Sequence, residues 1–250
     1  GFDGQMIGYA IPSIMKEWGT TRAAFSIAVA SGLAGMAIGS LSAGVLADKF
    51  GRKPVLIASI LLFGTATMLI GLSTDVQSIA FIRFFAGLGI GAALPAATTL
   101  TAEFVPMRYR TMAVTTAIVC YPLGGMLAGL AATKILPAYG WRTFFFIGGS
   151  LPIIYALVLI VILRESPKYL ARQSSRWEEL RALMTRMKHE VAHVSEFTDG
   201  IIESAKRGSI SDLFKHGRAA DTTWLWISFF AIQLSLYTAF SWLPTMLTTE

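Results

Sequence analysis

The chain has 250 residues, of which 54% are hydrophobic and 14% are charged, and its mean hydropathy is +0.59. This composition is too apolar for an ordinary soluble domain, in which about a quarter of the residues are charged. The formal net charge of +6 does not indicate a nucleic-acid partner, because no binding motif accompanies it and the basic residues lie beside apolar stretches or among acidic ones. The sequence therefore predicts an integral membrane protein.

Apolar stretches long enough to cross a bilayer recur along the chain. A hydrocarbon core of about 30 Å needs roughly 20 apolar residues in an α-helix. Five such stretches, and a sixth that is nearly complete near residue 247, run over 25–47, 54–72, 79–101, 112–136, 144–163 and from 223. We therefore expect an all-α membrane protein.

Both ends of the chain indicate a piece of a longer protein. Residues 2–15 are apolar but too short to span a bilayer, and no methionine or signal-peptide pattern precedes them. The last apolar stretch is followed by only a few residues. We expect a clipped first helix and a truncated last one.

Lys and Arg gather in alternate connections between the spans. They occur in DKFGRK (48–53), in VPMRYR (105–110) and over 164–218. The opposite connections have fewer: Lys16 and Arg22 in the first, none in STDVQS (73–78), and Arg142 with Lys134 nearby in the last. Because short cytoplasmic loops are enriched in positive charge, the N-terminus and the long segment are predicted to be cytoplasmic.

These features divide the chain into three parts. Residues 1–163 form an N-terminal transmembrane half, 164–221 a central cytoplasmic loop, and 222–250 the first helix of a C-terminal half. Within the loop, apolar residues from Trp177 to Val194 recur at helical spacing and predict an amphipathic helix.

GVLADKFGRK, residues 44–53, lies between the second and third helices and resembles the loop signature of the major facilitator superfamily. In that pattern a glycine allows helices to approach closely, an aspartate ends one helix, and a Gly-Arg-Lys turn begins the next. The matching residues are Gly44, Asp48, Gly51, Arg52 and Lys53.

RFFAGLGIGAALP, residues 83–95, is similar to the fourth-helix signature of the same superfamily. Its small residues Gly87, Gly89 and Gly91 permit close helix packing, and Pro95 frees a backbone carbonyl in a helix that must bend or slide. Arg83 lies only a few residues inside this span, so it either extends to the outer surface or faces the cavity and attracts an anion.

Two further stretches resemble sugar-porter-like members. EFVPMRYR has Glu103 and Arg110 at the family's E-x-x-P-x-x-x-R spacing, and RESPKYL retains Glu165 but has Arg164 in place of a proline. Together with Asp48 and Arg52, these charged residues would lie at the inner ends of the helices and form a conformational gate. The alternative is that the same residues make ion pairs on the surface that do not change between conformations.

GFDGQMIGYAIP resembles the first helix of the aromatic acid:proton symporters, in which the second aspartate of an Asp-Gly-x-Asp pattern corresponds to Asp3. An intramembrane carboxylate costs about 2.5 to 3.5 kcal/mol to insert, so it usually faces a cavity, a partner charge or a proton pathway. The resemblance implies that Asp3 couples transport to protons, and the alternative is a local cap or pair within the helix.

Other polar and aromatic side chains are candidates for substrate contact. Arg83 could bind an organic carboxylate, and Gln5, Tyr121, Tyr237 and Trp242 could line the same cavity. Aromatic residues at such places also commonly pack between helices or lie at the membrane interface.

The resemblance covers nearly the whole chain and implies a major facilitator fold of two six-helix halves that bind substrate between them. It favours a monomeric importer of aromatic or other small organic acids in a bacterial inner membrane, with the proton gradient as energy source and no cofactor. The alternatives are a facilitator for sugars, sialic acid, nicotinate or dicarboxylates, and a transporter-like membrane sensor.

An enzyme or a metal site is not predicted. The three histidines, His189, His193 and His216, all lie in the long loop, and no third ligand accompanies the pair at helical spacing.

Overall fold

The computed structural model describes residues 1–186, 217 and 219–247. Within them the chain forms helices and turns, and these residues include no strand. The helices are α1 (Phe2–Trp18), α2 (Arg22–Phe50), α3 (Arg52–Ile70), α4 (Val76–Phe104), α5 (Met107–Ile162), α6 (Pro167–Ala171), a 3₁₀ helix (Ser174–Arg176), α7 (Trp177–Arg186) and α8 (Ala219–Leu247). The prediction of an all-α protein is confirmed.

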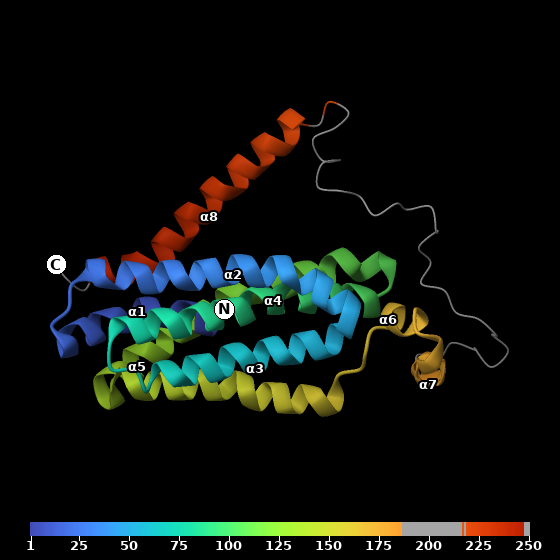
Figure 1. The fold of residues 1–250 in the computed structure, drawn as a ribbon, viewed down its shortest axis with the longest axis horizontal. Coiled ribbons are helices and arrows are strands. Elements are labelled where there is room, and N and C mark those ends of the chain that lie inside the picture. Colours follow the sequence, from blue (N-terminus) through green and yellow to red (C-terminus); the bar gives the residue numbers. More distant parts are fainter. Residues whose placement is uncertain (187–216, 218, 248–250) are drawn as a thin grey trace.

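The helices α1 to α5 run along the long axis of the molecule as one bundle, whereas α8 slants away from it (Figure 1). Four of them, α2 to α5, are long and apolar enough to cross a membrane, judged over the described residues. α5 contains two of the predicted spans, and Gly140 separates them with a non-helical backbone (φ 78°, ψ 171°). After Gly140 the chain runs back along the bundle (Figure 1).

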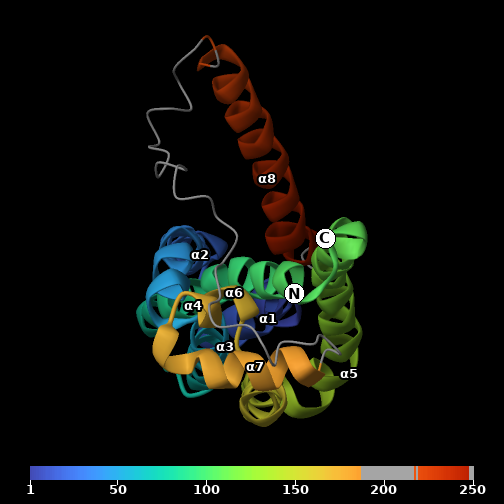
Figure 2. The same ribbon diagram turned by 90° about the vertical axis from the view of Figure 1, so that its right-hand side faces the viewer.

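The bundle has two chemically different ends. At the first, which we call the basic end, lie the α2–α3 turn, the α4–α5 turn and the short helices α6 and α7, with Lys49, Arg52, Lys53, Arg108 and Arg110. Figure 2 looks toward this end and shows α6 and α7 across it. The α3–α4 loop and Gly140 lie at the opposite end, so the connections alternate as the charge pattern predicts.

Glycines bring α2 and α4 into backbone contact. A Cβ atom at Gly87 would lie 2.1 Å from the carbonyl oxygen of Gly32, and one at Gly91 would lie 2.1 Å from that of Met36. Gly89 faces α3 instead, where a Cβ would lie 2.7 Å from the carbonyl oxygen of Ser59. Such approaches suit a membrane interior, where van der Waals packing rather than water exclusion holds helices together.

Two polar arrangements fix the opposite end. Asp75 caps α4 by accepting a hydrogen bond from the backbone N–H of Ser78 (2.7 Å). The pKa of Asp75 lies below its ordinary value, first because of this bond and second because the Ser78 hydroxyl also donates to the carboxylate. Trp141, next to the break in α5, donates from Nε1 to Glu17 Oε2 of α1 at 2.6 Å, so α1 is tied to the second run of α5.

Candidate functional site

Asp3 lies in the first turn of α1, and the start of the chain, marked N, lies midway along the bundle (Figure 1). Its side chain is buried, with an exposed fraction of 6%. Oδ1 accepts a hydrogen bond from the hydroxyl of Thr67 in α3. Oδ2 is buried and has no hydrogen-bond partner within the described part of the chain. Asp3 is therefore a buried carboxyl group that has one oxygen hydrogen-bonded and, as far as the described residues go, one oxygen without a partner.

Arg83 is the positive counterpart of Asp3. It is buried to the same extent and interacts electrostatically with Asp3 across the space between α4 and α1. Its Nε and Nη1 atoms are buried without a hydrogen-bond partner among the described residues. Gly32 of α2 makes room for the guanidinium, because a Cβ there would lie 3.3 Å from Nε. Arg83 thus points into the bundle and does not extend to the outer surface.

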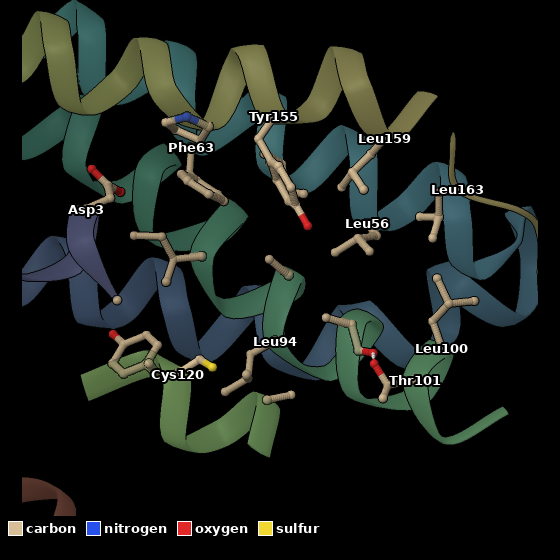
Figure 3. A pocket seen from close by; sticks show the side chains of 18 of the residues that line it. Asp3, Leu56, Phe63, Leu94, Leu100, Thr101, Cys120, Tyr155, Leu159 and Leu163 are labelled. Atoms are coloured by element: carbon tan, nitrogen blue, oxygen red, sulfur yellow. Dashed lines mark hydrogen bonds between the residues drawn. The ribbon is translucent and has the colours of Figure 1, made fainter. Parts of the chain in front are cut away.

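A cavity of about 740 Å³ opens beside Asp3. Figure 3 shows Asp3 at one end of it and Thr101 and Leu163 at the other, with the Phe63 and Tyr155 side chains directed into it. The wall is mostly aliphatic, and it includes four aromatic rings, those of Phe63, Phe104, Tyr121 and Tyr155. Among the lining residues that the structure describes, Asp3 has the only charged side chain.

This volume is within the roughly 300 to 1,000 Å³ typical of small-molecule sites. An apolar wall with few polar groups suits a small ligand that is itself mostly apolar. A single buried carboxyl group at the end of such a wall can change the charge of the cavity by taking up or releasing a proton.

The predicted substrate-contact residues fall into three groups. Tyr121 lines the cavity. Gln5 and Arg83 do not line it; Gln5 is buried against α5, where a Cβ at Gly125 would lie 2.8 Å from its Cγ atom. The side chains of Tyr237 and Trp242 lie outside the part that the structure describes. Substrate contact by these residues stays a prediction.

A second polar cluster lies at the basic end and joins four of the predicted gate residues. Arg52 is central: its Nη2 lies 3.0 Å from Asp48 Oδ1, and its Nε lies 3.4 Å from Glu103 Oε2. Glu165 Oε1 accepts hydrogen bonds from the backbone N–H groups of Arg52 (3.0 Å) and Lys53 (3.1 Å). We call Asp48, Arg52, Glu103 and Glu165 the charge cluster.

The other predicted gate residues have different surroundings. Arg110 makes no ion pair with any described residue, and its Nε is buried without a hydrogen-bond partner among them. Lys53 Nζ donates to the carbonyl oxygen of Ile160 at 2.8 Å and so ties α3 to the end of α5. A Cβ at Gly44 would meet nothing within 4 Å in the described residues, so the close approach expected there is not made within this part of the protein.

Both sites also contain residues beyond those that the sequence predicts for them. The Thr67 hydroxyl donates a hydrogen bond to Asp3. The Ser166 hydroxyl donates to the Glu103 carboxylate. The ring of Tyr169 packs against the Arg52 guanidinium, with Cζ of Arg52 5.8 Å from the ring centroid. Arg172 Nη1 adds a second cation 3.6 Å from Asp48 Oδ1.

The dipeptide Ser166-Pro167 does carry a sequence signal, because serine at the N-cap followed by proline is typical of a helix start. Thr67 carries none, since threonine is common in apolar helices.

The expected amphipathic helix is described only in part. α7 covers Trp177–Arg186 and buries Leu180. The rest of that prediction, residues 187–194, and the three histidines lie outside the described residues. The described residues include no group of three His, Cys, Asp or Glu side chains that could hold a metal ion.

Comparison with known proteins decides the family. The model of the Major Facilitator Superfamily matches residues 1–250 of the chain. The chain belongs to this superfamily. The resemblance seen in its loop and helix signatures is therefore confirmed, and the fold is that of an integral membrane protein.

Relatives within the superfamily include transporters of aromatic acids. The chain is 35% identical over 251 residues to the 4-hydroxybenzoate transporter PcaK of Acinetobacter baylyi, covering 99% of this chain and 55% of the relative. It is 32% identical over 247 residues to the gallate transporter of Pseudomonas putida, again covering 99% of this chain and 55% of the relative. The chain thus spans about half the length of the curated relatives it matches. The family and these relatives are transporters and not enzymes, as expected from the sequence.

Solved structures show the same major facilitator fold. The proton:xylose symporter XylE bound to 6-bromo-6-deoxy-D-glucose matches with a TM-score of 0.63 and 20% identity, over 74% of this chain and 46% of that one. At this identity the likeness shows the fold alone.

Proposed function

We propose that the full-length protein imports aromatic acids together with protons by alternating access. The observation that carries this proposal is the cavity beside Asp3, which combines an apolar wall, four aromatic rings and one buried carboxyl group. An aromatic ring packs favourably against other rings and against aliphatic side chains. The named substrates of the relatives, 4-hydroxybenzoate and gallate, support the same substrate class.

Asp3 is the proton-coupling group in this proposal. When the outer side delivers a proton, the cavity loses its one negative charge, so an organic anion can enter without facing a second anion in a poorly solvated space. Release of the proton on the inner side restores the negative charge and favours departure of the substrate. The proton gradient is the energy source, and no other cofactor is required.

Arg83 supplies the matching positive charge. Its Nε and Nη1 donors have no hydrogen-bond partner among the described residues, and it interacts electrostatically with Asp3. Once Asp3 is protonated, its negative charge no longer balances the positive charge of the Arg83 guanidinium. The guanidinium would then attract the carboxylate of the substrate.

The charge cluster at the basic end is the proposed gate. Ion pairs that are made in one conformation and broken in another change the relative populations of the two conformations. Here the pairs join the α2–α3 turn to α4 and to the segment after α5. Movement of these helices relative to one another would therefore break or remake them.

The topology and location follow from charge. The basic end would face the cytoplasm, because Lys and Arg are retained on that side of the membrane. We place the protein in a bacterial inner membrane and expect it to act as a monomer, with a second half completing the cavity wall.

Transport assays test the proposal directly. The complete reading frame is reconstituted into proteoliposomes, and uptake of radiolabelled 4-hydroxybenzoate is followed under an inward proton gradient. We expect gradient-driven uptake that is lost in Asp3→Asn while substrate binding persists. Asp75→Asn is the matched control, because Asp75 is exposed at the opposite end and asparagine caps helices equally well.

Each failure has a separate meaning. Absence of 4-hydroxybenzoate uptake by the wild type would overturn the substrate class, and uptake of xylose or nicotinate in its place would identify one of the alternatives. Gradient-driven uptake that survives in Asp3→Asn would remove Asp3 from the coupling mechanism.

A further inference from the structure

Among the residues that the structure describes, Thr67 is the one side chain that donates a hydrogen bond to the Asp3 carboxyl group. Its exposed fraction is 0%, and its hydroxyl donates to Asp3 Oδ1 from α3 to α1. It does not line the cavity. Any effect of Thr67 on transport must therefore act through Asp3 rather than through contact with substrate.

The direction of this hydrogen bond is unusual within the bundle. Thr65, two positions earlier in α3, donates to the Leu61 carbonyl oxygen of its own helix at 2.7 Å, and Thr101 of α4 donates to Ala97 at 2.8 Å. That is the common choice for threonine in a helix. A hydroxyl has a single hydrogen, so the hydrogen that Thr67 directs to Asp3 is withheld from its own helix.

This contact makes the two oxygens of Asp3 inequivalent. Oδ1 is occupied by the Thr67 hydroxyl, whereas Oδ2 is buried and unpartnered within the described residues. The bond also fixes the rotation of the carboxyl group, because exchange of the two oxygens would break it. Within the described part of the chain, Oδ2 is therefore the carboxyl oxygen that is left without a hydrogen bond and can take up a proton.

We propose that Thr67 is a positioning residue for proton coupling: its hydroxyl holds Asp3 Oδ1, directs protonation to Oδ2 and stabilises the ionised form of the carboxyl group. The inference rests on the proposed function of Asp3. In each cycle an O–H bond forms at Oδ2 with a proton from water on one side, and the same proton returns to water on the other side. The Thr67 hydrogen stays on Thr67 throughout.

Other charged and titratable groups surround Asp3 and set the background for this effect. They are Arg83 of α4 and Tyr121 of α5, whose hydroxyl lies beside Gly4. Neither of them changes when Thr67 is replaced. A change in the pH dependence of a Thr67 variant therefore reports the hydroxyl.

The test measures 4-hydroxybenzoate uptake by the full-length protein between pH 5 and pH 9. Thr67→Val keeps the size of the side chain and removes the donor. A hydrogen bond to a carboxylate favours its ionised form, so its loss should move the pH of half-maximal uptake upward by about one unit. The KM at the optimal pH should stay within about twofold of the wild type, because Thr67 does not touch the cavity.

Two further comparisons separate the hydroxyl from packing. Serine and alanine both lack the γ-methyl group of threonine, but only serine keeps the hydroxyl donor. Thr67→Ser should therefore retain the pH profile of the wild type, whereas the profile of Thr67→Ala should shift upward as that of the valine variant does. This pair gives the answer even when the valine variant does not fold. Thr65→Val is the matched control on the same helix and should leave the profile unchanged.

Specific results would overturn the inference. A wild-type profile in Thr67→Val, or equal profiles in the serine and alanine variants, would show that the hydroxyl does not act on Asp3. A wild type whose uptake shows no pH dependence would instead contradict the proposed proton coupling itself.

Discussion

Arg52 Nη2 lies 3.0 Å from Asp48 Oδ1 although the two residues belong to different helices, since α2 ends at Phe50 and α3 begins at Arg52. The turn between them consists of Gly51, with φ 106° and ψ 156°. This backbone region is essentially restricted to glycine. The sharp turn brings the end of α2 and the start of α3 close enough for the ion pair to form.

The first prediction concerns Gly51. A Cβ at this position would lie 2.4 Å from Glu165 Oε2 and would also require a strained backbone. Gly140 has a similar backbone (φ 78°, ψ 171°), but a Cβ there meets nothing within 4 Å in the described residues. We expect Gly140→Ala to lower the free energy of unfolding by about 2 kcal/mol from backbone strain. Gly51→Ala should lower it by about 2 kcal/mol more from the clash.

Thermal unfolding of the purified protein in detergent measures both variants. The difference between them isolates the contact with Glu165. Equal melting temperatures for the two variants would contradict the placement of Glu165 against Gly51.

The second prediction concerns Glu165, which acts as a helix cap from a distant part of the chain. Its Oε1 accepts from the backbone N–H groups of Arg52 and Lys53 at the start of α3, and from Ser166 N–H at 2.9 Å. The carboxyl group is 3% exposed. Because helix N-termini carry partial positive charge, a carboxylate there satisfies orphan donors and complements the dipole.

We expect Glu165→Ala to reduce the free energy of unfolding by about 3 kcal/mol, since buried N–H groups lose their acceptor. Glu165→Gln keeps an acceptor oxygen and should cost only about 1 kcal/mol. Glu179→Ala is the control, because its ion pair with Arg176 is exposed and such pairs are worth less than about 1 kcal/mol. Chemical unfolding in detergent compares the three, and an alanine variant as stable as the glutamine variant would argue against capping.

The fold was largely predictable because its signals are local. Runs of about 20 apolar residues predict membrane helices, and alternating Lys and Arg predict which ends lie together. The sequence also predicts the break within α5 as a gap between two spans, since polar and small residues around Gly140 interrupt the apolar pattern. The domain boundaries within 164–221 stay predictions, because most of that segment lies outside the described residues.

The sites were predictable only where a motif or a charge marks the residue. Asp3 and Arg83 stand out because charged side chains are rare inside apolar helices. The depth of Arg83 could not be predicted, because it depends on the space that Gly32 leaves in a neighbouring helix. Thr67 and Tyr169 act through contacts that connect separate helices, and neither residue type is unusual where it occurs. Gln5 was expected to line the cavity, but the rotation of α1 directs it toward α5.

The last prediction concerns the aromatic wall of the cavity. Phe63 of α3 directs its ring into the cavity from the same side as Tyr155 (Figure 3). An aromatic contact contributes about 0.5 to 1.5 kcal/mol beyond the area it buries. Phe63→Leu keeps an apolar side chain and removes the ring, so we expect the KM for 4-hydroxybenzoate to rise about fivefold with little change in maximal rate.

Competition with a saturated analogue makes this prediction specific. The ring of 4-hydroxycyclohexanecarboxylate has similar size and the same polar groups but no π-system, so its inhibition constant should change less than twofold in Phe63→Leu. Phe81→Ala is the control on α4, because that ring is 68% exposed and does not line the cavity. An equal loss of affinity for both ligands would show that Phe63 contributes shape alone, and unchanged affinity for both would remove this wall from the substrate site.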